Sequence, residues 1–301
     1  MTKTLFIINP HAGRAQKVWR VLERQLASWV DDYSVITTQS PDDIATALQQ
    51  ATDMTADRII SIGGDGTNKF MVNALMAHRE AYPDFDCVFG CIPAGTGRDF
   101  ARGVGLPLDS LKAAEYVLMK AQPRPVDIGI ATFDGQRHYF LNVSSAGIAN
   151  DVVQRVERSP KRPWTFLWSV LSALVRYEPE HVQIELDGKM WFEGHIYVAG
   201  IANGKSIGQG ILIAPDAIVD DGLFDVVVAE KMTTWQLMNA FPTIYVGKHI
   251  SHPKVHSNRA RHVRITLPKQ ASIGIDLDGE PATVYDDIEY EIAPSALRML
   301  L

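Results

Sequence analysis

The chain has 301 residues, enough for two domains or one large domain with a sizeable core. Its hydrophobic content of 46% and charged content of 21% are ordinary for a soluble globular protein, and its formal net charge of −6 argues against general nucleic-acid binding. No apolar stretch reaches ~18 residues and no signal-peptide pattern opens the chain, so we expect a cytoplasmic protein without a transmembrane anchor.

The first hundred residues alternate between short apolar runs and helical patterns. Strands are expected at Leu5–Ile8, Tyr33–Thr38, Ile59–Ile62 and Cys87–Ile92. Ser40 followed by Pro41 predicts the start of a helix, with Ser40 as N-cap. Strands that alternate with helices predict a doubly wound, parallel α/β sheet, whose ligands bind beyond the carboxyl ends of the strands.

A glycine-rich loop, Gly63-Gly64-Asp65-Gly66-Thr67, follows the third expected strand and precedes a helical pattern. Free N–H groups at such a helix N-terminus suit a phosphate group. An ordinary strand-to-helix turn is the alternative. Asp65 favours a nucleotide with Mg²⁺, because a carboxylate facing phosphate is repelled unless a cation lies between them.

Four segments end expected strands in this half: Asn9–Gly13, Thr38, Gly63–Thr67 and Thr96–Asp99. Because the carboxyl ends of parallel strands share one edge of a sheet, we expect these segments to converge on one crevice.

After Pro123-Arg124-Pro125 the pattern changes to short alternating runs. Strands are expected at Tyr139–Val143, Val182–Leu186, Trp191–Ile201, Phe224–Ala229, Val263–Leu267, Ser272–Leu277 and Ala282–Glu291, with helical segments at Thr165–Tyr177 and Thr234–Val246. Asp187-Gly188 and Asp278-Gly279 are typical hairpin turns. We therefore predict an α/β domain over residues 1–127, a mainly antiparallel β-sandwich over 128–291, and a C-terminal segment, 292–301, that packs back onto a domain.

Five motifs occur in a fixed order along the chain. They are Asn9–Gly13 (Asn-Pro-x-Ala-Gly), Gly63–Thr67, Pro93–Arg102, the pair Ala214–Ala217 and Asp220–Asp225, and Asp278–Glu280. This set resembles the bacterial soluble diacylglycerol kinases and related lipid kinases, including sphingosine kinases, over nearly the whole chain. NAD kinases share the glycine-rich loop and a β-rich second half, but the other segments fit the lipid kinases better.

The resemblance implies ATP-dependent transfer of the γ-phosphate to a diacylglycerol-like lipid hydroxyl, a step of phospholipid metabolism. It implies a nucleotide site at Asn9, Pro10, Gly13, Thr38, Gly63, Gly64, Asp65, Gly66, Thr67, Thr96 and Asp99. Thr38 is preferred to Thr37 because its spacing to Asp43 matches the family. The resemblance also implies Mg²⁺ on Asp221 and the main-chain oxygens of Ile218 and Leu223.

For catalysis, the resemblance implies Glu280 as the proton acceptor, with Asp278 and Asp65 completing the catalytic set. Without it, Asp278-Gly279 and Asp220-Asp221-Gly222 are plain turns. Two departures from the family pattern, Lys69-Phe70 after the glycine loop and Arg98 for an asparagine, are expected to place cations beside the phosphates. They indicate either tighter phosphate binding or a different donor or substrate.

Two other functions stay open. One is a kinase for NAD or another soluble hydroxyl compound, and the other is a non-catalytic nucleotide- or lipid-binding protein. A homodimer is compatible with the sequence. Cys87 and Cys91 are expected to be buried thiols, and His249, His252, His256 and His262 to lie in a solvated basic loop rather than at a zinc site.

A lipid kinase without a transmembrane anchor must reach its substrate at a membrane surface. From Lys231 to Ile275 the chain has no Asp or Glu but seven Lys and Arg residues: Lys231, Lys248, Lys254, Arg259, Arg261, Arg264 and Lys269. A second basic and aromatic patch comprises Arg155, Arg158, Lys161, Arg162, Trp164, Phe166, Leu167 and Trp168. Both patches suit a peripheral contact with an anionic membrane, and the alternative for the aromatic residues is a core helix.

Overall fold

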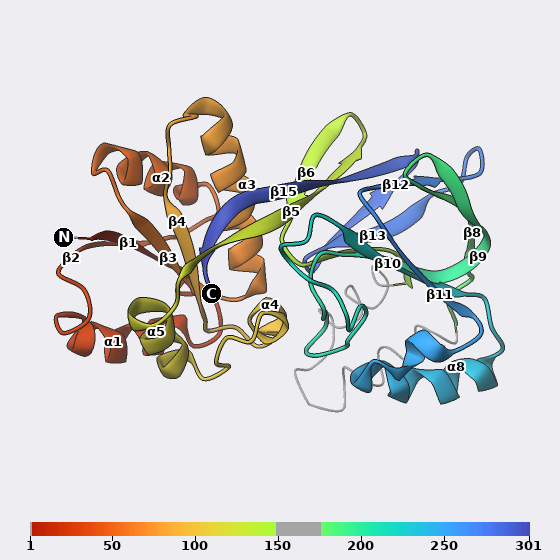
Figure 1. Ribbon diagram of the computed structural model, residues 1–301, viewed down its shortest axis with the longest axis horizontal. Helices are drawn as coiled ribbons and strands as arrows, with labels where there is room; N and C mark the ends of the chain where they lie inside the picture. The colour runs from red at the N-terminus through yellow and green to blue at the C-terminus, as the bar shows by residue number, and fades with distance from the viewer. Residues whose placement is uncertain (1, 149–175) are drawn as a thin grey trace. The chain divides into compact units, whose positions relative to one another are not determined.

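The computed structural model describes residues 2–148 and 176–301 (Figure 1). The chain folds into two compact units: unit 1 is Met1–Ile128 with Pro294–Leu301, and unit 2 is Gly129–Ala293. It passes between them within two strands, β5 (Pro123–Phe133) and β15 (Ile288–Leu300). Except for Arg176 and Tyr177, the predicted helix Thr165–Tyr177 lies outside the described residues, as does the predicted basic and aromatic patch of residues 155–168.

Unit 1 is an α/β fold built on a parallel sheet in the order β2-β1-β3-β4, with the end of β15 beside β4. Its strands are β1 (Lys3–Ile8), β2 (Asp32–Thr37), β3 (Arg58–Gly63) and β4 (Val88–Pro93). Its helices are α1 (Ala15–Leu26), α2 (Asp43–Asp53), α3 (Asp65–Ala81), α4 (Asp99–Gly103) and α5 (Ser110–Met119). The doubly wound α/β prediction is therefore confirmed.

The burial of each strand follows from its place in this sheet. β1, β3 and β4 are buried over almost their whole length, as expected for parallel strands covered by helices on both faces. β2 is an edge strand and alternates between exposed and half-buried residues. Helices α1 and α5 cover one face of the sheet, and α2 and α3 cover the other (Figure 1).

The strand order creates a switch point between β1 and β3. The chain leaves β1 toward β2 on one side and reaches β3 on the other side, so the connections after β1 and β3 diverge. In open α/β sheets such a point opens a crevice at the carboxyl ends of the strands. The asparagine-proline loop and the glycine-rich loop both start there.

Unit 2 is a β-sandwich-like fold in which every paired strand runs antiparallel to its neighbour among the described residues. The strands are β6 (Gln136–Phe140), β7 (Val143–Gly147), β8 (Glu180–Leu186), β9 (Lys189–Ala202), β10 (Phe224–Glu230), β11 (Val255–Ala260), β12 (His262–Thr266), β13 (Ile273–Leu277) and β14 (Glu280–Val284), with the first part of β15. β9 takes part in both layers, because its first half pairs with β8 and its second half pairs with β7 and β10.

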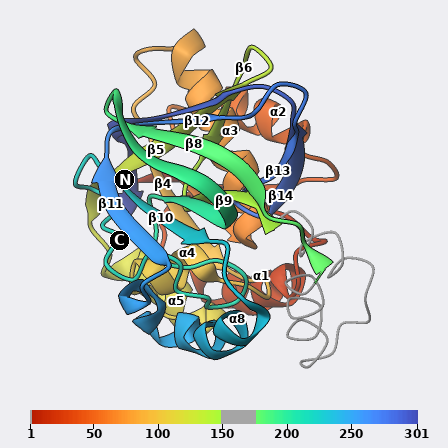
Figure 2. The ribbon, with the colours of Figure 1, turned by 90° about the vertical axis from the view of Figure 1, so that its right-hand side faces the viewer.

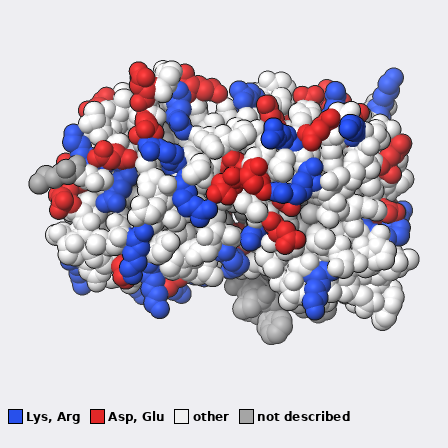
Figure 3. All heavy atoms as spheres, viewed as in Figure 1, with Lys and Arg blue, Asp and Glu red and all other residues white. Residues whose placement is uncertain are grey.

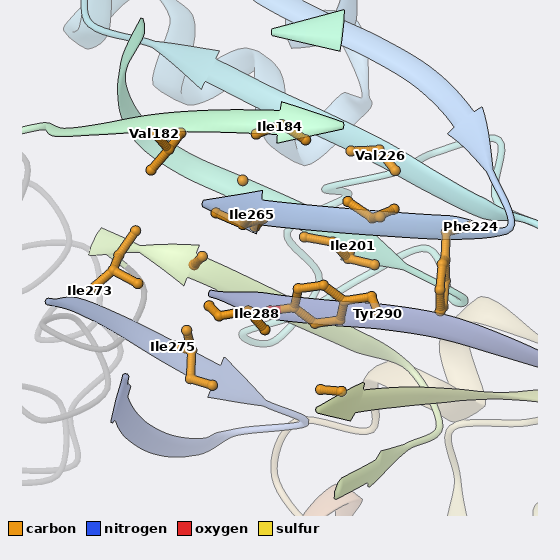
Figure 4. Close-up of a cluster of buried hydrophobic side chains, with 14 of the residues drawn as sticks. Val182, Ile184, Ile201, Phe224, Val226, Ile265, Ile273, Ile275, Ile288 and Tyr290 are labelled. Carbon is orange, nitrogen blue, oxygen red and sulfur yellow. The ribbon is translucent and has the colours of Figure 1, made fainter. Parts of the chain in front are cut away.

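One hydrophobic core lies between the two layers of unit 2 (Figure 4). Ile201 and Ile275 come from the layer of β7, β9 and β13, whereas Ile184, Ile265 and Tyr290 come from the layer of β8, β12 and β15. All five side chains are fully buried. Burial of this apolar area is the main favourable contribution to folding of the unit.

A short helical segment connects β10 to β11 at the lower margin of unit 2 in both views (Figures 1 and 2). It consists of α8 (Thr234–Ala240) and two 3₁₀ helices, η1 (Phe241–Val246) and η2 (Lys248–Ser251). Thr233 caps α8 by accepting the N–H of Gln236. The predicted helix Thr234–Val246 is thus confirmed as helical but not as one α-helix. Pro242 has no N–H group for the α-helical ladder, and the chain continues as a 3₁₀ helix from that point.

Several sequence expectations were wrong in detail. Helix α2 begins at Asp43 rather than at Ser40, because the Asp43 carboxylate accepts the N–H groups of Gln39 and Ser40 at 2.6 and 3.0 Å and holds them in a turn. The expected strand Tyr139–Val143 is the end of β6, a two-residue break and the start of β7.

The prediction that the four histidines lie in one solvated loop is also wrong. His249 is buried on η2, His256 lies in β11 and His262 lies in β12. Both cysteines are free, as predicted; Cys91 is buried, whereas Cys87 is half-buried.

Candidate active site

Three loops of unit 1 are hydrogen-bonded to one another beyond β1, β3 and β4. Asn9 donates its side-chain N–H to Thr67 Oγ1 at 3.0 Å and its backbone N–H to Ile62 O at 3.1 Å, which joins the first two loops. Ala94 donates to Gly63 O at 2.7 Å, which joins the third. Of the four segments expected to converge, Asn9–Gly13 and Gly63–Thr67 are joined by these bonds, and Thr96–Asp99 lies beside them because Gly97 contacts the side chain of Asp65.

Glycine allows these loops to approach so closely. Gly13 has φ +52°, and a Cβ there would lie 2.5 Å from the carbonyl oxygen of Ala94. A Cβ on Gly95 would lie 2.6 Å from Cα of Gly64. Both distances are shorter than a carbon atom permits, so a side chain at either position would push the loops apart. Helix α3 begins next to this contact, and its first N–H groups have no partner within the helix.

Two carboxylates converge in front of Gly97. A Cβ at Gly97 would lie 2.7 Å from Oδ2 of Asp65 and 3.1 Å from Oδ2 of Asp99, so both oxygens face the space that the glycine leaves open. Their other oxygens are held: Asp65 Oδ1 accepts the N–H of Phe100 at 3.3 Å, and Asp99 Oδ1 accepts from Arg102 Nη1 at 2.9 Å. Such oxygens are typical ligands of Mg²⁺.

The remaining predicted nucleotide-site residues of unit 1 differ in exposure. Thr38 is 6% exposed and its hydroxyl donates to Ile8 O at 3.2 Å, which brings it to the end of β1. Gly66 and Thr96 are exposed, and Pro10 is half-buried. Exposed main chain beside a helix N-terminus is accessible to a phosphate group.

The structure shows the local surroundings of the two residues that depart from the family pattern, Arg98 and Lys69. Arg98 adopts a left-handed conformation, with φ 57° and ψ 34°, that asparagine tolerates better than arginine. Its Nη1 donates to the carbonyl oxygen of Leu108 at 2.7 Å, and its expected place beside the phosphates stays a prediction. Lys69 is buried on α3, at 8% exposure.

In unit 2, the carboxylate of Asp278 is turned inward and holds the break between β6 and β7. Oδ2 accepts the N–H of Leu141 at 2.7 Å, and Oδ1 accepts those of Asn142 and Val143 at 3.0 and 2.9 Å. Burial raises the pKa of this carboxyl group to about 6, although the three backbone N–H groups favour the ionised form. Asp278 thus fixes the backbone, while the residue itself stands in the turn at φ 51°.

Glu280 differs from Asp278 in exposure. It lies two residues farther on, at the start of β14, and it is exposed. Gly279 between them has φ 90°, as this hairpin turn requires. The structure therefore separates the two predicted carboxylates into a half-buried, hydrogen-bonded one and an exposed one.

Sequence reasoning missed three polar residues around this turn. Asp276 accepts the N–H of Gly279 at 3.1 Å and so braces the turn. Asn203 donates its side-chain N–H to Leu141 O at 2.7 Å, and Asn142 donates to Ser206 O at 2.6 Å. The bonds of Asn203 and Asn142 join segments more than sixty residues apart, so no local sequence signal identifies them. The bond of Asp276 lies within a sequence typical of an ordinary turn.

The predicted metal ligands of unit 2 lie in an acidic turn before β10. Asp221 Oδ1 accepts the N–H of Leu223 at 3.1 Å, and its Oδ2 contacts Arg259 Nη2. Burial, and then the nearby charge of Asp216, raise the pKa of Asp225 to about 6. Arg259 Nε lies 3.5 Å from Asp225 Oδ2, which is buried and accepts no hydrogen bond.

These residues fit a hard cation. Asp221 and Asp225 both lie beside the single cation of Arg259, the buried Oδ2 of Asp225 accepts no hydrogen bond, and oxygen donors are what Mg²⁺ prefers. Within the described residues no three His, Cys, Asp or Glu side chains are grouped to hold a metal, so main-chain oxygens such as those of Ile218 and Leu223 would have to complete the site.

Comparison with known proteins identifies the family of both units. The sequence profile described as "Diacylglycerol kinase catalytic domain" matches residues 3–131, and that described as "YegS C-terminal NAD kinase beta sandwich-like domain" matches residues 142–301. The chain is 31% identical over 261 residues to a diacylglycerol kinase of Mycobacterium tuberculosis, covering 85% of this chain and 79% of the relative. It is 29% identical over 308 residues to the diacylglycerol kinase of Bacillus subtilis, covering 96% and 95%.

The fold is shared with a solved structure. A crystal structure of a diacylglycerol kinase from Bacillus anthracis matches with a TM-score of 0.75 at 23% identity, covering 99% of this chain and 96% of that one. Within residues 2–148 and 176–301, no helix is both long and apolar enough to span a bilayer.

An α/β unit with a glycine-rich loop, followed by a β-sandwich-like unit with these matches, defines a lipid kinase, a phosphotransferase with an alcohol group as acceptor. The chain belongs to the family of diacylglycerol kinases and YegS-like lipid kinases. The predicted resemblance is confirmed.

Proposed function

We propose that this kinase transfers the γ-phosphate of ATP to the hydroxyl group of a diacylglycerol-like lipid at a membrane surface. The observation that carries the donor side is the convergence of Asp65 Oδ2 and Asp99 Oδ2 in front of Gly97, beside the N-terminus of α3. Main-chain N–H groups of the glycine-rich loop would bind the phosphates, and the two carboxylates would face them through Mg²⁺.

On the acceptor side, Glu280 is the exposed carboxylate of the Asp278–Glu280 turn and is assigned as the proton acceptor. In the reaction the lipid oxygen loses its proton to Glu280 and forms a bond to phosphorus, while the bond from phosphorus to the leaving oxygen of ADP breaks. Asp278 is assigned a positioning role, because its carboxylate is committed to three backbone N–H groups.

Mg²⁺, when bound, would neutralise charge on the phosphates, and Asp65 and Asp99 would hold it there. In unit 2, Asp221 with the main-chain oxygens of Ile218 and Leu223 would hold a second Mg²⁺ that stabilises the turn. The buried Oδ2 of Asp225, which accepts no hydrogen bond, supports this second site.

The test is a phosphorylation assay with labelled ATP and three acceptors: diacylglycerol, a total lipid extract and NAD. NAD is included because the profile over residues 142–301 is described as NAD kinase-like. We expect labelled lipid and no labelled NADP, and mass spectrometry of the product would identify the lipid. Phosphorylation of NAD alone would overturn the assignment of the acceptor.

Asp65→Asn tests the donor side. We expect activity to fall roughly 10²–10³-fold with the melting temperature unchanged. The variant would hold Mg²⁺ less well, so the negative charge of the phosphates would no longer be neutralised. Asp31→Asn, the same change at an exposed position of unit 1, should keep full activity. Near-normal turnover of Asp65→Asn would mean that the glycine-rich loop is an ordinary strand-to-helix turn without a role in phosphate binding.

A further inference from the structure

The segment from α8 to η1 exposes apolar side chains that have no partner within the described fold. Trp235 is 73% exposed and Met238 is 53% exposed, and they lie three residues apart on one side of α8. Val246, at the end of η1, is 64% exposed. Large apolar side chains gathered on one surface of a monomer indicate a contact with another molecule or with a membrane.

The exposure is not a sign of a loosely attached helix. Met232 and Leu237 are buried at 7% and 8% and pack with Tyr197 and Ile148 against the sheet. The helix therefore has one apolar side for the core of unit 2 and a second apolar side for its surroundings. A helix that serves only the core carries polar residues on its outer side.

The charges around the segment favour an anionic surface. Residues 232–247 contain no Asp, Glu, Lys or Arg, and Lys231 and Lys248 flank them. Both lysines are exposed, and no ion pair of either occurs among the described residues. In Figure 3 the surface over α8, at lower right, is largely white, with basic side chains at its margin.

The wider basic stretch contributes less charge than its sequence indicates. Lys254 pairs with Glu230 at 2.8 Å, Arg259 contacts Asp221, and Arg264 pairs with Asp287 at 3.0 Å. Of the seven basic residues, Lys231 and Lys248 are the two that directly flank residues 232–247, and neither has an ion pair among the described residues. Because the whole chain carries −6, an anionic membrane would repel most of the molecule and attract it only locally.

We propose that the α8–η1 surface, defined as Lys231, Trp235, Met238, Val246 and Lys248, docks the protein on an anionic lipid bilayer. Trp235, Met238 and Val246 enter the interface between headgroups and acyl chains, and the two lysines contact the anionic headgroups. A tryptophan suits this place because its ring is apolar and its N–H can stay hydrated. This inference rests on the proposed function in one respect, that the acceptor is a membrane lipid.

The test is cosedimentation with vesicles of phosphatidylglycerol and phosphatidylcholine in equal parts, without nucleotide. The double variant Trp235→Ala/Met238→Ser should bind roughly tenfold more weakly than the wild type, because most of the inserted apolar area is lost. The matched control is Tyr285→Ala/Met190→Ser, which changes side chains of equal exposure, 72% and 53%, elsewhere in unit 2. We expect the control to bind like the wild type.

Two further measurements separate the contributions. Lys231→Gln/Lys248→Gln should weaken binding to the mixed vesicles roughly tenfold and leave binding to pure phosphatidylcholine unchanged. Trp235→Phe should keep vesicle binding but lose most of the fluorescence shift that vesicles induce in the wild type. Each variant should retain the wild-type melting temperature, since the changed side chains are exposed.

Activity on diacylglycerol dispersed in detergent distinguishes this inference from the proposed function. If the wild type is active in detergent but does not bind vesicles, or if the double variant binds them as well as the control does, docking by this surface is overturned. If the double variant only dissociates a dimer in sedimentation and still binds vesicles, the surface is a contact between two copies of the chain. If the wild type binds vesicles but phosphorylates no lipid, either in vesicles or in detergent, the proposed function is overturned instead.

Discussion

The two units build their candidate sites from different parts of the chain. In unit 1 the candidate site is built mainly from main chain, namely glycine loops that touch one another and a helix N-terminus, and its two carboxylates, Asp65 and Asp99, belong to the same loops and helix starts. In unit 2 it consists of side chains that hold distant segments, such as Asp278 on Leu141–Val143 and Arg259 on Asp221. A main-chain site depends on small residues at fixed local spacing, whereas a side-chain site depends on contacts across the sheet.

This difference predicts different responses to mutation. A substitution in the glycine loops should change backbone geometry and donor binding together. Substitutions in the Asp278–Glu280 turn of unit 2 should affect either turnover or stability but not both, because Glu280 is exposed whereas the half-buried Asp278 binds three backbone N–H groups.

The largest effect is expected at Glu280. Glu280→Gln keeps the size of the side chain and removes its basic oxygen, so turnover should fall roughly 10²–10⁴-fold while nucleotide binding and melting temperature stay unchanged. Steady-state kinetics with diacylglycerol, together with a nucleotide-binding titration, measure both. If Glu280→Gln retains wild-type turnover and Asp278→Asn does not, the base is Asp278 and the positioning role assigned to it is wrong.

The turn before Glu280 also gives a test on stability. Asp278→Asn places an amide N–H against backbone N–H groups that need an acceptor, and should lower the free energy of unfolding by about 2–4 kcal/mol at pH 5. Asp187→Asn is the matched control, since Asp187 opens the other Asp-Gly hairpin and accepts the N–H groups of Arg261 and His262 in an exposed turn. Denaturant unfolding should show a smaller loss for Asp187→Asn.

The stability difference between the wild type and Asp278→Asn should depend on pH. The pKa of Asp278 is about 6 in the folded protein and 3.8 as the ordinary value, so the folded state binds more protons between these values. The stability that this carboxyl group contributes is therefore fully present below pH 4 and is lost as the pH rises through 6. The difference between wild type and Asp278→Asn should narrow by about 2 kcal/mol from pH 4 to pH 7. If the difference widens as the pH rises, the three backbone N–H groups lower the pKa of Asp278 more than burial raises it.

Much of unit 1 could be predicted from the sequence because its determinants are local. Continuous apolar runs identify β1, β3 and β4, and the glycine-rich loop identifies the start of α3. The start of α2 was missed because Ser40 does not cap the helix; instead, the Asp43 carboxylate accepts the N–H groups of Gln39 and Ser40 and holds them in a turn before the helix.

In unit 2 the hairpin turns were predictable but their partners were not. Asp187-Gly188 and Asp278-Gly279 take positive φ values, as expected for such turns. The break at Leu141 and Asn142 is imposed by Asp278, more than 130 residues away, and the sequence there is as apolar as a strand. The ion pairs of Lys254 and Arg264 were not predictable for the same reason, since their acidic partners lie on other elements, and the predicted membrane contact of this basic stretch stays a prediction.

A smaller effect is expected for close loop packing in unit 1. Gly95→Ala places a carbon 2.6 Å from the backbone of Gly64, and should lower the free energy of unfolding by about 1–3 kcal/mol and raise the KM for ATP. Gly66→Ala is the control: no atom lies within 4 Å of the added carbon, and it should be neutral or more stable by up to about 1 kcal/mol. Equal melting temperatures for the two variants would show that the loops have room to move apart.

The smallest effect is expected at Asp221, because its role in unit 2 is structural and Arg259 already offsets part of its charge. Mg²⁺ without nucleotide should raise the melting temperature of the wild type by a few degrees, since an ion that binds only the folded state stabilises it. Asp221→Asn should lose this rise and reduce turnover only a few-fold. Asp134→Asn, a neutralised aspartate in the exposed β5–β6 turn, should keep the full rise. If Asp221→Asn responds to Mg²⁺ as the control does, the acidic turn before β10 holds no metal, and the contact with Arg259 alone neutralises Asp221.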